Sequence, residues 1–175
     1  MPPVIRPARA DEAAALAELG ARLFLDTYGR AGSPANVAAH VAATYGIARQ
    51  AAELADPACR MLVAEEEGVL AAYALLGRGP APASVVAAAP VEVRRFYVDR
   101  PWRGTGLAVR LMAAADDAAH ALGGDRLWLC AWEQATWARR FYEKAGFAVV
   151  GHQPFHLGAE VHRDVVMTRA VARAG

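Results

Sequence analysis

The segment FYVDRPWRGTGLAVRLM, residues 96–112, carries the clearest chemical pattern of the chain. Its Arg103-Gly104-Thr105-Gly106 stands between a β-rich run and an apolar pattern of helical period. The first N–H groups of a helix are unpaired and carry partial positive charge, so they favour anions. Glycine lets the backbone approach a ligand closely and adopt conformations that other residues avoid. The segment therefore predicts a site for a phosphate or pyrophosphate group.

Known phosphate-binding patterns each differ from this segment at an essential position. The dinucleotide pattern GxGxxG matches Gly104 and Gly106 but meets Val109 where its third glycine should stand. A Walker loop needs Gly-Lys-Ser/Thr, and the only lysine of the chain is Lys144, far downstream. From these residues alone a second interpretation stays open, in which a short glycine turn only connects a strand to a helix.

Cysteine and histidine positions match no metal-binding motif. Cys59 and Cys130 are far apart and form no CxxC pair. The five histidines are scattered along the chain: His40, His120, His152, His156 and His162. We therefore expect no metal ion and reduced thiols.

Composition and charge indicate an ordinary globular protein. The chain has 175 residues, of which 55% are hydrophobic and 21% are charged, and we expect a single domain over residues 1–175. The net charge of +1 gives no reason to expect a nucleic acid or an anionic membrane as partner. The start MPPVIRPARADE lacks the apolar run of a secretory signal, and no apolar stretch is long enough to span a bilayer. A cytoplasmic protein is expected.

Hydrophobic periodicity and turn residues predict the elements that must position the glycine segment. A short strand at PVIRPA is followed by three helices, and RMLVAEEEGVLAAYALL is typical of a β-hairpin. Later elements alternate: a strand at 91–98, a helix after the glycines, a strand at DRLWLCAW, a helix at TWARRFYEK, and strands near 147–151 and 163–169. This order predicts an α/β sandwich with a mixed sheet.

The strand at 91–98 has an irregular pattern. Val91 and Val93 share one parity, whereas Phe96 and Val98 share the other. Because successive residues of a strand point to opposite faces, this pattern indicates either a bulge near Arg94-Arg95 or a strand that is buried on both faces. A bulge would separate the strand from one neighbour and free backbone groups for a ligand.

Two motifs resemble the GNAT superfamily of acetyl-CoA-dependent N-acetyltransferases. Residues 103–108, RGTGLA, fit the Gln/Arg-x-x-Gly-x-Gly/Ala motif, and RRFYEKAGF resembles the FYxKxGF segment at the expected distance behind it. Other segments along nearly the whole chain look like small bacterial relatives of spermidine/spermine acetyltransferases. The resemblance implies an α/β (α+β) fold with a mixed, mostly antiparallel sheet of about seven strands. It also implies helices on both faces and a splay at the central strand.

The resemblance implies acetyl-CoA as co-substrate, with its pyrophosphate bound by backbone N–H groups of the glycine segment. The pantetheine arm would bond to the backbone of the preceding strand, and the N–H of Val98 would polarise the thioester carbonyl. The implied cofactor-binding residues are Phe96, Tyr97, Val98, Arg103, Gly104, Thr105, Gly106, Leu107 and Ala108. One departure is Ala135, which stands where relatives often carry a cofactor-contacting asparagine; Gln134 beside it would approach from another direction.

Acetyl transfer to an amine needs a neutral amine, a polarised carbonyl and a proton for the departing thiolate. By the resemblance, Tyr142 supplies that proton; its alternative role is a packed aromatic side chain. Glu92 is the expected base, acting through water; its alternative is a strand-face glutamate paired with Arg94 or Arg139. Some relatives carry the carboxylate on the following strand, where this chain has Cys130. We expect Cys130 to be an ordinary buried thiol, because direct transfer needs no acyl-enzyme.

Three segments are expected to shape the acceptor site: Leu25–Ser33, Gly77–Pro90 and His152–His162. Trp132, Glu133 and Asp26 would line a pocket for a cationic amine. The expected acceptor is a small primary amine such as a polyamine. The alternatives are a protein N-terminus, an amino acid or an antibiotic amine, and a sensing module that binds acetyl-CoA with weak or no catalysis. A homodimer stays open as an assembly.

Overall fold

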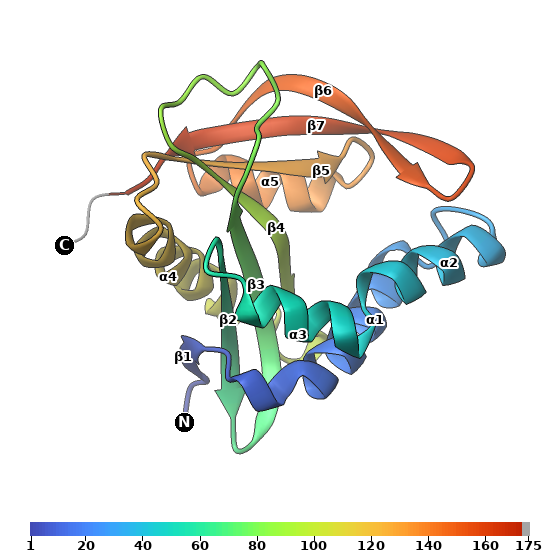
Figure 1. The fold of residues 1–175 in the computed structure, drawn as a ribbon, viewed down its shortest axis with the longest axis vertical. Coiled ribbons are helices and arrows are strands. Elements are labelled where there is room, and N and C mark those ends of the chain that lie inside the picture. The colour runs from blue at the N-terminus through green and yellow to red at the C-terminus, as the bar shows by residue number, and fades with distance from the viewer. Residues whose placement is uncertain (173–175) are drawn as a thin grey trace.

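In the computed structural model, which describes residues 1–172, the chain forms a seven-stranded sheet with helices on both faces (Figure 1). The elements follow in the order β1 (Val4–Pro7), α1 (Ala13–Tyr28), α2 (Pro34–Thr44), α3 (Ile47–Ala55), β2 (Cys59–Glu66), β3 (Val69–Arg78), β4 (Pro90–Val98), α4 (Leu107–Ala121), β5 (Arg126–Trp132), α5 (Thr136–Lys144), β6 (Ala148–Leu157) and β7 (Glu160–Ala170). The predicted order of helices and strands is confirmed.

The sheet is mixed and mostly antiparallel, as predicted. Its strand order is β1-β2-β3-β4-β5-β7-β6, and β4 and β5 form its parallel pair. These two strands pair over only three positions, from Pro90↔Arg126 to Glu92↔Trp128. Beyond Glu92 they separate, which is the predicted splay at the central strand.

The predicted bulge lies in β4. Leu75 of β3 pairs with Arg95, but the next residue Leu76 pairs with Val93, so Arg94 is the extra residue. The bulge reverses the parity of the strand. As a result, Val93 and Phe96 face one side of the sheet, and four polar or aromatic side chains face the other: Glu92, Arg94, Arg95 and Tyr97.

Two hydrophobic cores hold the helices on the two faces. Leu62 and Ala64 of β2 pack towards α4, whose buried stripe is Leu107, Leu111, Met112, Ala115 and Ala119. The alternate residues Met61 and Val63 pack with the α1 residues Leu16, Leu19 and Leu23. The sheet is therefore a shared wall with α1–α3 on one side and α4 on the other. Within residues 1–172, no helix combines the length and the apolar character needed to cross a membrane.

The last two strands are longer than predicted. The expected ranges 147–151 and 163–169 cover only the part of the two strands that lies alongside β5, whereas the paired β6–β7 hairpin continues beyond β5 towards α2 (Figure 1). The continuation alternates exposed and half-buried residues instead of showing an apolar run. Its apolar pattern is too weak to mark a strand, because much of this ribbon faces solvent.

Tertiary contacts hold the tip of the β6–β7 hairpin. The Glu160 carboxylate accepts hydrogen bonds from the Ser33 N–H (2.7 Å) and from Nδ2 of Asn36 (2.9 Å) at the start of α2. Buried Leu157 packs in a cluster with Phe24, Val37 and Tyr45. The hairpin and α1–α2 thereby enclose a space on the face of the sheet opposite α4.

Candidate active site

The glycine segment forms an exposed turn at the N-terminus of α4. Gly104 and Gly106 have φ of +79° and +84°, a left-handed conformation that side chains disfavour. A Cβ added at either glycine would meet no atom of residues 1–172 within 4 Å. Gly106 is the N-cap of α4, so the unpaired N–H groups of the first turn adjoin this open space. The geometry fits an anionic group at this turn.

The edge of β4 beyond the splay offers main-chain hydrogen-bonding groups. The Asp99 N–H donates a hydrogen bond to the carbonyl of Ala71 at 2.9 Å. This bond shows which residues of β4 direct their main-chain N–H and C=O groups towards β3 and which direct them away from it. By that alternation, the main-chain groups of Tyr97 bond to β3, whereas those of Phe96 and Val98 point to the gap next to β5. An extended ligand can pair with this edge as an additional strand.

The side chains of Arg103 and Tyr97, two residues expected to bind the cofactor, contact other parts of the protein. Nε of Arg103 donates to the carbonyl of Val98 at 2.9 Å, which ties the glycine turn to the strand edge. The Tyr97 ring stacks on Tyr73 (5.7 Å between centroids) on the opposite face of the sheet. Tyr97 thus contributes its side chain to that face, and the Phe96 and Val98 backbone is what faces the gap.

Tyr142 of α5 lies against the strand that borders the gap. Its ring packs edge-on against Phe96 (6.3 Å) and Phe147 (5.8 Å). Burial raises the pKa of Tyr142 well above its usual value, and Tyr28 on the other face of the sheet adds to the shift. The phenol is therefore protonated at neutral pH. The packed-aromatic contacts are present, and Tyr142 is not among the residues that line the pocket described below.

Ala135 is the N-cap of α5, and its side chain is buried. It provides no polar group where relatives were expected to have an asparagine. Gln134, the residue before it, is exposed.

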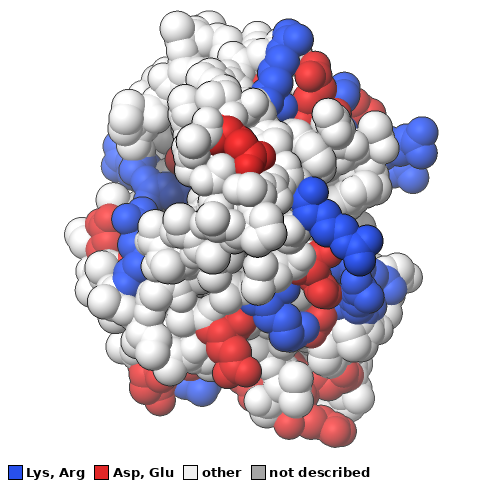
Figure 2. Space-filling view, turned by 90° about the vertical axis from the view of Figure 1, so that its right-hand side faces the viewer, with Lys and Arg blue, Asp and Glu red and all other residues white. Residues whose placement is uncertain are grey.

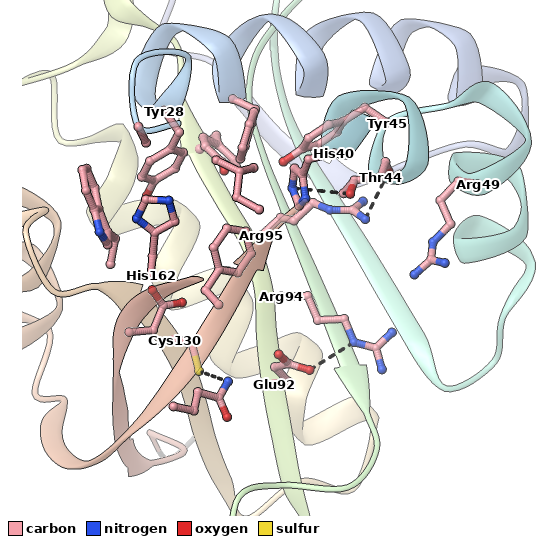
Figure 3. Close-up of a pocket in the computed structure, with 18 of the residues that line it drawn as sticks. Tyr28, His40, Thr44, Tyr45, Arg49, Glu92, Arg94, Arg95, Cys130 and His162 are labelled. Carbon is pink, nitrogen blue, oxygen red and sulfur yellow. Dashed lines mark hydrogen bonds and ion pairs between the residues drawn. The ribbon is translucent and has the colours of Figure 1, made fainter. Parts of the chain in front are cut away.

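A pocket of about 640 Å³ opens on the face opposite α4 (Figure 3). Each of the three segments expected to shape the acceptor site contributes to its wall. These contributions are Tyr28 and Ala31, then Gly79 and Pro80, then Gln153, Phe155, Leu157 and His162. The rest comes from α1–α3 and from the centres of β4, β5 and β7. The pocket therefore collects residues from almost the whole chain.

Trp132 lines the pocket as predicted, but the expectation for Glu133 and Asp26 is wrong. Glu133 follows the end of β5 and lies 3.8 Å from Arg163 at the surface. Asp26 forms an ion pair with Arg100 at 3.2 Å, outside the pocket. Position near an aromatic residue in the sequence does not determine which way a carboxylate points.

Glu92 lies in the pocket and contacts Arg94, with 3.4 Å between carboxylate oxygen and Nε. Arg139 instead donates to the main-chain carbonyl of Glu133. Burial raises the pKa of Glu92, and Arg94 opposes this shift. A half-buried carboxylate with a raised pKa is suited to accept a proton, so the ion pair and a role as base are compatible.

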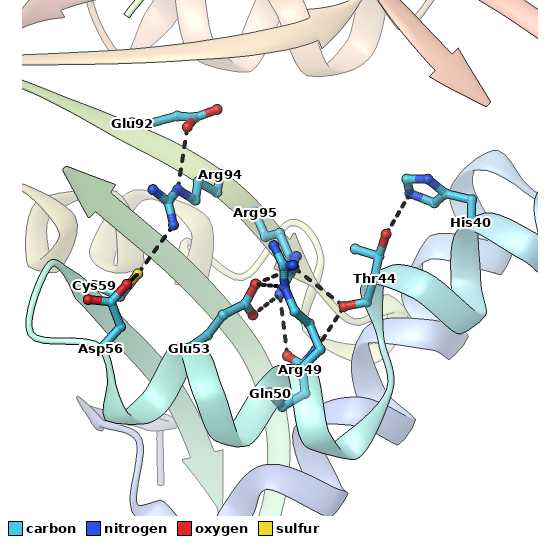
Figure 4. A network of polar contacts seen from close by, with 10 residues as sticks. All are labelled: His40, Thr44, Arg49, Gln50, Glu53, Asp56, Cys59, Glu92, Arg94 and Arg95. Carbon is cyan, nitrogen blue, oxygen red and sulfur yellow. Dashed lines mark hydrogen bonds and ion pairs between the residues drawn. The ribbon is translucent and has the colours of Figure 1, made fainter. Parts of the chain in front are cut away.

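The end of the pocket next to α3 is basic, and its charges are paired (Figure 4). The Arg95 guanidinium, 9% exposed, donates to both carboxylate oxygens of Glu53 at 2.6 and 2.9 Å. It also donates to Gln50 and to the main-chain carbonyl of Thr44. This network ties the bulge of β4 to α2 and α3. Arg95 is therefore a buried structural cation.

The end of the pocket next to β7 is acidic and aromatic. Asp164 is 8% exposed, yet its Oδ1 has no hydrogen-bond partner within residues 1–172, and the same holds for Nε2 of His162. Trp132 stands edge-on to both His162 (5.8 Å) and Tyr28 (6.2 Å). Burial raises the pKa of Asp164 to about 6, and His162 opposes the shift.

Sequence reasoning missed Asp164. Its available signal was weak: a single carboxylate directly before the apolar run VVM, at a position that β-pairing places opposite Trp132.

Cys130 lies on the pocket wall between the two carboxylate-bearing strands and is half-buried. Its Sγ accepts a hydrogen bond from Nε2 of Gln153 at 2.8 Å. Burial raises the pKa of this thiol to about 12, with Asp164 and Glu92 adding to the shift. The thiol is thus uncharged at neutral pH and a poor nucleophile. In the described part of the chain, no three His, Cys, Asp or Glu side chains are grouped to hold a metal ion.

A family model and a similar protein of known sequence both indicate the same family for this chain. Residues 22–147 match the model of the acetyltransferase (GNAT) family. An uncharacterised N-acetyltransferase of Mycobacterium tuberculosis is 36% identical over 160 residues, covering 91% of this chain and 96% of the relative. The chain therefore belongs to the GNAT family of acetyltransferases, and it is an acyltransferase enzyme.

Solved structures share the fold across nearly the whole chain. The PaiA N-acetyltransferase of Thermoplasma acidophilum, in complex with coenzyme A, has a TM-score of 0.76 at 18% identity, over 97% of this chain and 99% of the other. The YncA protein of Salmonella typhimurium, solved with acetyl-CoA, has a TM-score of 0.67 at 22% identity, over 100% and 97%. These similarities establish the GNAT fold with its seven-stranded sheet.

Proposed function

We propose that this enzyme transfers the acetyl group of acetyl-CoA directly to a primary amine, and that the amine is small and cationic, such as a polyamine. One observation carries this proposal. The gap between β4 and β5 has a glycine turn at a helix N-terminus and a free strand edge on one side. On the other side is a pocket lined by three carboxylates, of which Glu53 is paired with Arg95. Carboxylates and aromatic walls favour a cation.

The cofactor side of the gap suits acetyl-CoA in three respects. The glycine turn and the first turn of α4 supply N–H groups for the pyrophosphate, in the space that a side chain at Gly104 or Gly106 would fill. The main-chain groups of Phe96 and Val98 suit the amide groups of the pantetheine arm. The bound co-substrate supplies an activated thioester at the gap, and the N–H of Val98 polarises its carbonyl.

Two groups of this chain, Glu92 and Tyr142, share the remaining work. Glu92 takes a proton from the amine through a water molecule, and its raised pKa suits that task. As the nitrogen bonds to the acetyl carbon, the carbon–sulfur bond breaks. The Tyr142 hydroxyl, kept protonated by burial, donates its proton to the departing sulfur. Transfer is direct because the Cys130 thiol stays protonated and offers no nucleophile.

The test is release of free CoA from acetyl-CoA with a panel of acceptors. The panel contains aliphatic diamines, monoamines, amino acids, peptides with free N-termini and aminoglycosides. We expect the highest kcat/KM for small aliphatic amines. A peptide, amino acid or aminoglycoside as the best acceptor would overturn the proposed substrate class. No turnover with any amine, in a protein whose melting temperature rises with acetyl-CoA, would instead identify a sensing module.

A further inference from the structure

The two ends of the pocket differ in how far their polar groups are already partnered. At the basic end, the Arg95 guanidinium bonds to Glu53, Gln50 and the Thr44 carbonyl. Arg94 contacts Glu92, the Cys59 thiol and the Arg78 carbonyl. Buried Arg95 and the more exposed Arg94 are thus both partnered by the protein itself. An anionic group of a substrate would have to displace existing bonds there.

The acidic end has the opposite property. Buried Asp164 keeps Oδ1 without a partner among the residues that the structure describes, and His162 Nε2 makes no hydrogen bond there either, although it lies 3.8 Å from Oε2 of Glu160. A buried polar atom without a hydrogen bond is costly, and native proteins retain few such atoms. Both atoms belong to residues that line the pocket, and the rings of Tyr28 and Trp132 stand beside them. An ammonium group supplies the N–H donor that the Asp164 oxygen lacks, and aromatic faces attract it as well.

Asp164 is too far from Glu92 for one amine to serve both. Glu92 of β4 is level with Trp128 of β5, whereas Asp164 of β7 is level with Trp132. The two carboxylates are thus two strands and four residues apart in the sheet, which places their backbones roughly 16 Å from each other by ordinary strand spacings. In Figure 3, His162, which is two residues from Asp164 on β7, and Glu92 lie on different parts of the pocket wall.

We propose that Asp164, with Trp132, Tyr28 and His162, forms a second cation subsite that holds the non-reacting ammonium group of a diamine or polyamine. This rests on the proposed function and names its specificity determinant. The reacting nitrogen must be neutral at Glu92, whereas the distant nitrogen keeps its charge and pairs with Asp164. The subsite therefore selects acceptors with two amino groups over monoamines of the same length.

The experiment compares 1,4-diaminobutane to 1,8-diaminooctane with monoamines of equal chain length, in the wild type and in Asp164→Asn. A charge-assisted hydrogen bond is worth about ten- to a hundredfold in binding. We expect the wild type to prefer the best diamine by at least about tenfold in kcat/KM. Asp164→Asn should remove most of that preference through KM, with monoamine turnover within about threefold of wild type.

Asp26→Asn is the matched control, because Asp26 is a carboxylate in an ion pair with Arg100 outside the pocket. It should keep the diamine preference. Equal use of diamines and monoamines by the wild type would overturn the subsite, and so would an equal loss on both substrates in Asp164→Asn.

A binding measurement separates failure of the subsite from failure of the proposed function. Calorimetric titration of the diamines into the CoA-bound protein needs no turnover. Weaker diamine binding in Asp164→Asn than in Asp26→Asn supports the subsite even if no amine is acetylated, which would contradict the proposed function alone. Absence of diamine binding to the wild type would contradict the subsite.

Discussion

In the proposed function, the two sides of the gap between β4 and β5 use different parts of the polypeptide for recognition. The proposed cofactor side consists of main-chain groups from one continuous segment, residues 96–108, with glycines that leave space. The proposed acceptor side consists of side chains from α1–α3, β4, β5, β6 and β7. Main-chain recognition depends on local backbone shape, whereas side-chain recognition depends on which distant elements meet. The first is compact in sequence and the second is not.

Charges on the acceptor side show a further contrast. Arg95 is buried with a full set of partners, whereas Asp164 is buried with an unpartnered oxygen. Exposed charges differ from both of these buried ones, because on the face in Figure 2 basic and acidic side chains are interspersed and in contact with solvent. Buried paired charges stabilise the position of an element. A buried unpartnered charge lowers stability unless a ligand completes it.

The largest effect is expected for Tyr142, the cofactor-side residue whose side chain takes part in the proposed chemistry. Tyr142→Phe should lower kcat by about 10²–10⁴-fold, because general acid catalysis contributes that much, and leave the acetyl-CoA dissociation constant nearly unchanged. Tyr73→Phe is the matched control, since its buried hydroxyl has no hydrogen-bond partner in the described part of the chain. A kcat loss under about threefold, or an equal loss in the control, would refute the role as acid.

Loss of the buried ion pair between Arg95 and Glu53 should lower the stability of the protein. Arg95→Met leaves the Glu53 carboxylate buried without its main partner, so we expect the free energy of unfolding to fall by about 3–5 kcal/mol in urea titrations. Arg49→Met removes an exposed partner of the same carboxylate and should cost under about 0.5 kcal/mol. Similar losses in the two variants would show that the buried pair has no special structural role.

Binding of acetyl-CoA should depend on the open space next to Gly106. Gly106→Asp adds a side chain and a negative charge in the space next to the α4 N-terminus, and saturating acetyl-CoA should no longer raise the melting temperature. At a ligand concentration of a hundred times Kd, the lost stabilisation is about 2.7 kcal/mol.

Gly68→Asp is the control for backbone strain. Gly68 also has positive φ (+82°), and a Cβ there would likewise meet no described atom within 4 Å, but it lies in the β2–β3 turn. Acetyl-CoA should stabilise this variant as it does the wild type. An undiminished ligand shift in folded Gly106→Asp would reject the turn as the pyrophosphate site.

Removing the charge of Asp164 should raise the free energy of unfolding, whereas removing the charge of Arg95 should lower it. The pKa of Asp164 is raised to about 6, so ionisation is unfavourable in the folded state relative to the unfolded state. The wild type therefore loses stability as pH rises from about 4 to above 6, whereas Asp164→Asn lacks this loss. We expect the variant to be more stable by on the order of 2 kcal/mol at pH 8.

This difference between Asp164→Asn and wild type should disappear below about pH 4, because a protonated carboxyl resembles the amide. Glu92 titrates in both proteins, so its raised pKa cancels in the comparison. Unfolding of both proteins in urea at pH 4, 6 and 8 checks the prediction. A variant less stable than wild type at pH 8 would show that Asp164 stabilises the fold, contrary to the contrast drawn with Arg95.

The sequence by itself determined the features that depend on local geometry. The parity change between Val93 and Phe96 indicated a bulge as one of two interpretations, and the structure has that bulge. The two glycines indicated a turn with unusual backbone angles before the helix, and both have positive φ. Glu92 was placed correctly in the strand that borders the gap. Each of these features is encoded within a few consecutive residues, because backbone conformation and strand parity are local properties.

Only the tertiary structure decided the acceptor side. Asp164 comes to the pocket wall because β7 pairs with β5, and the pocket closes because Glu160 and Leu157 bind the start of α2 and the cluster around Phe24. Asp26 was expected there but points to Arg100 instead. The burial and partners of a carboxylate depend on residues far away in the sequence, and a local pattern contains no information about them.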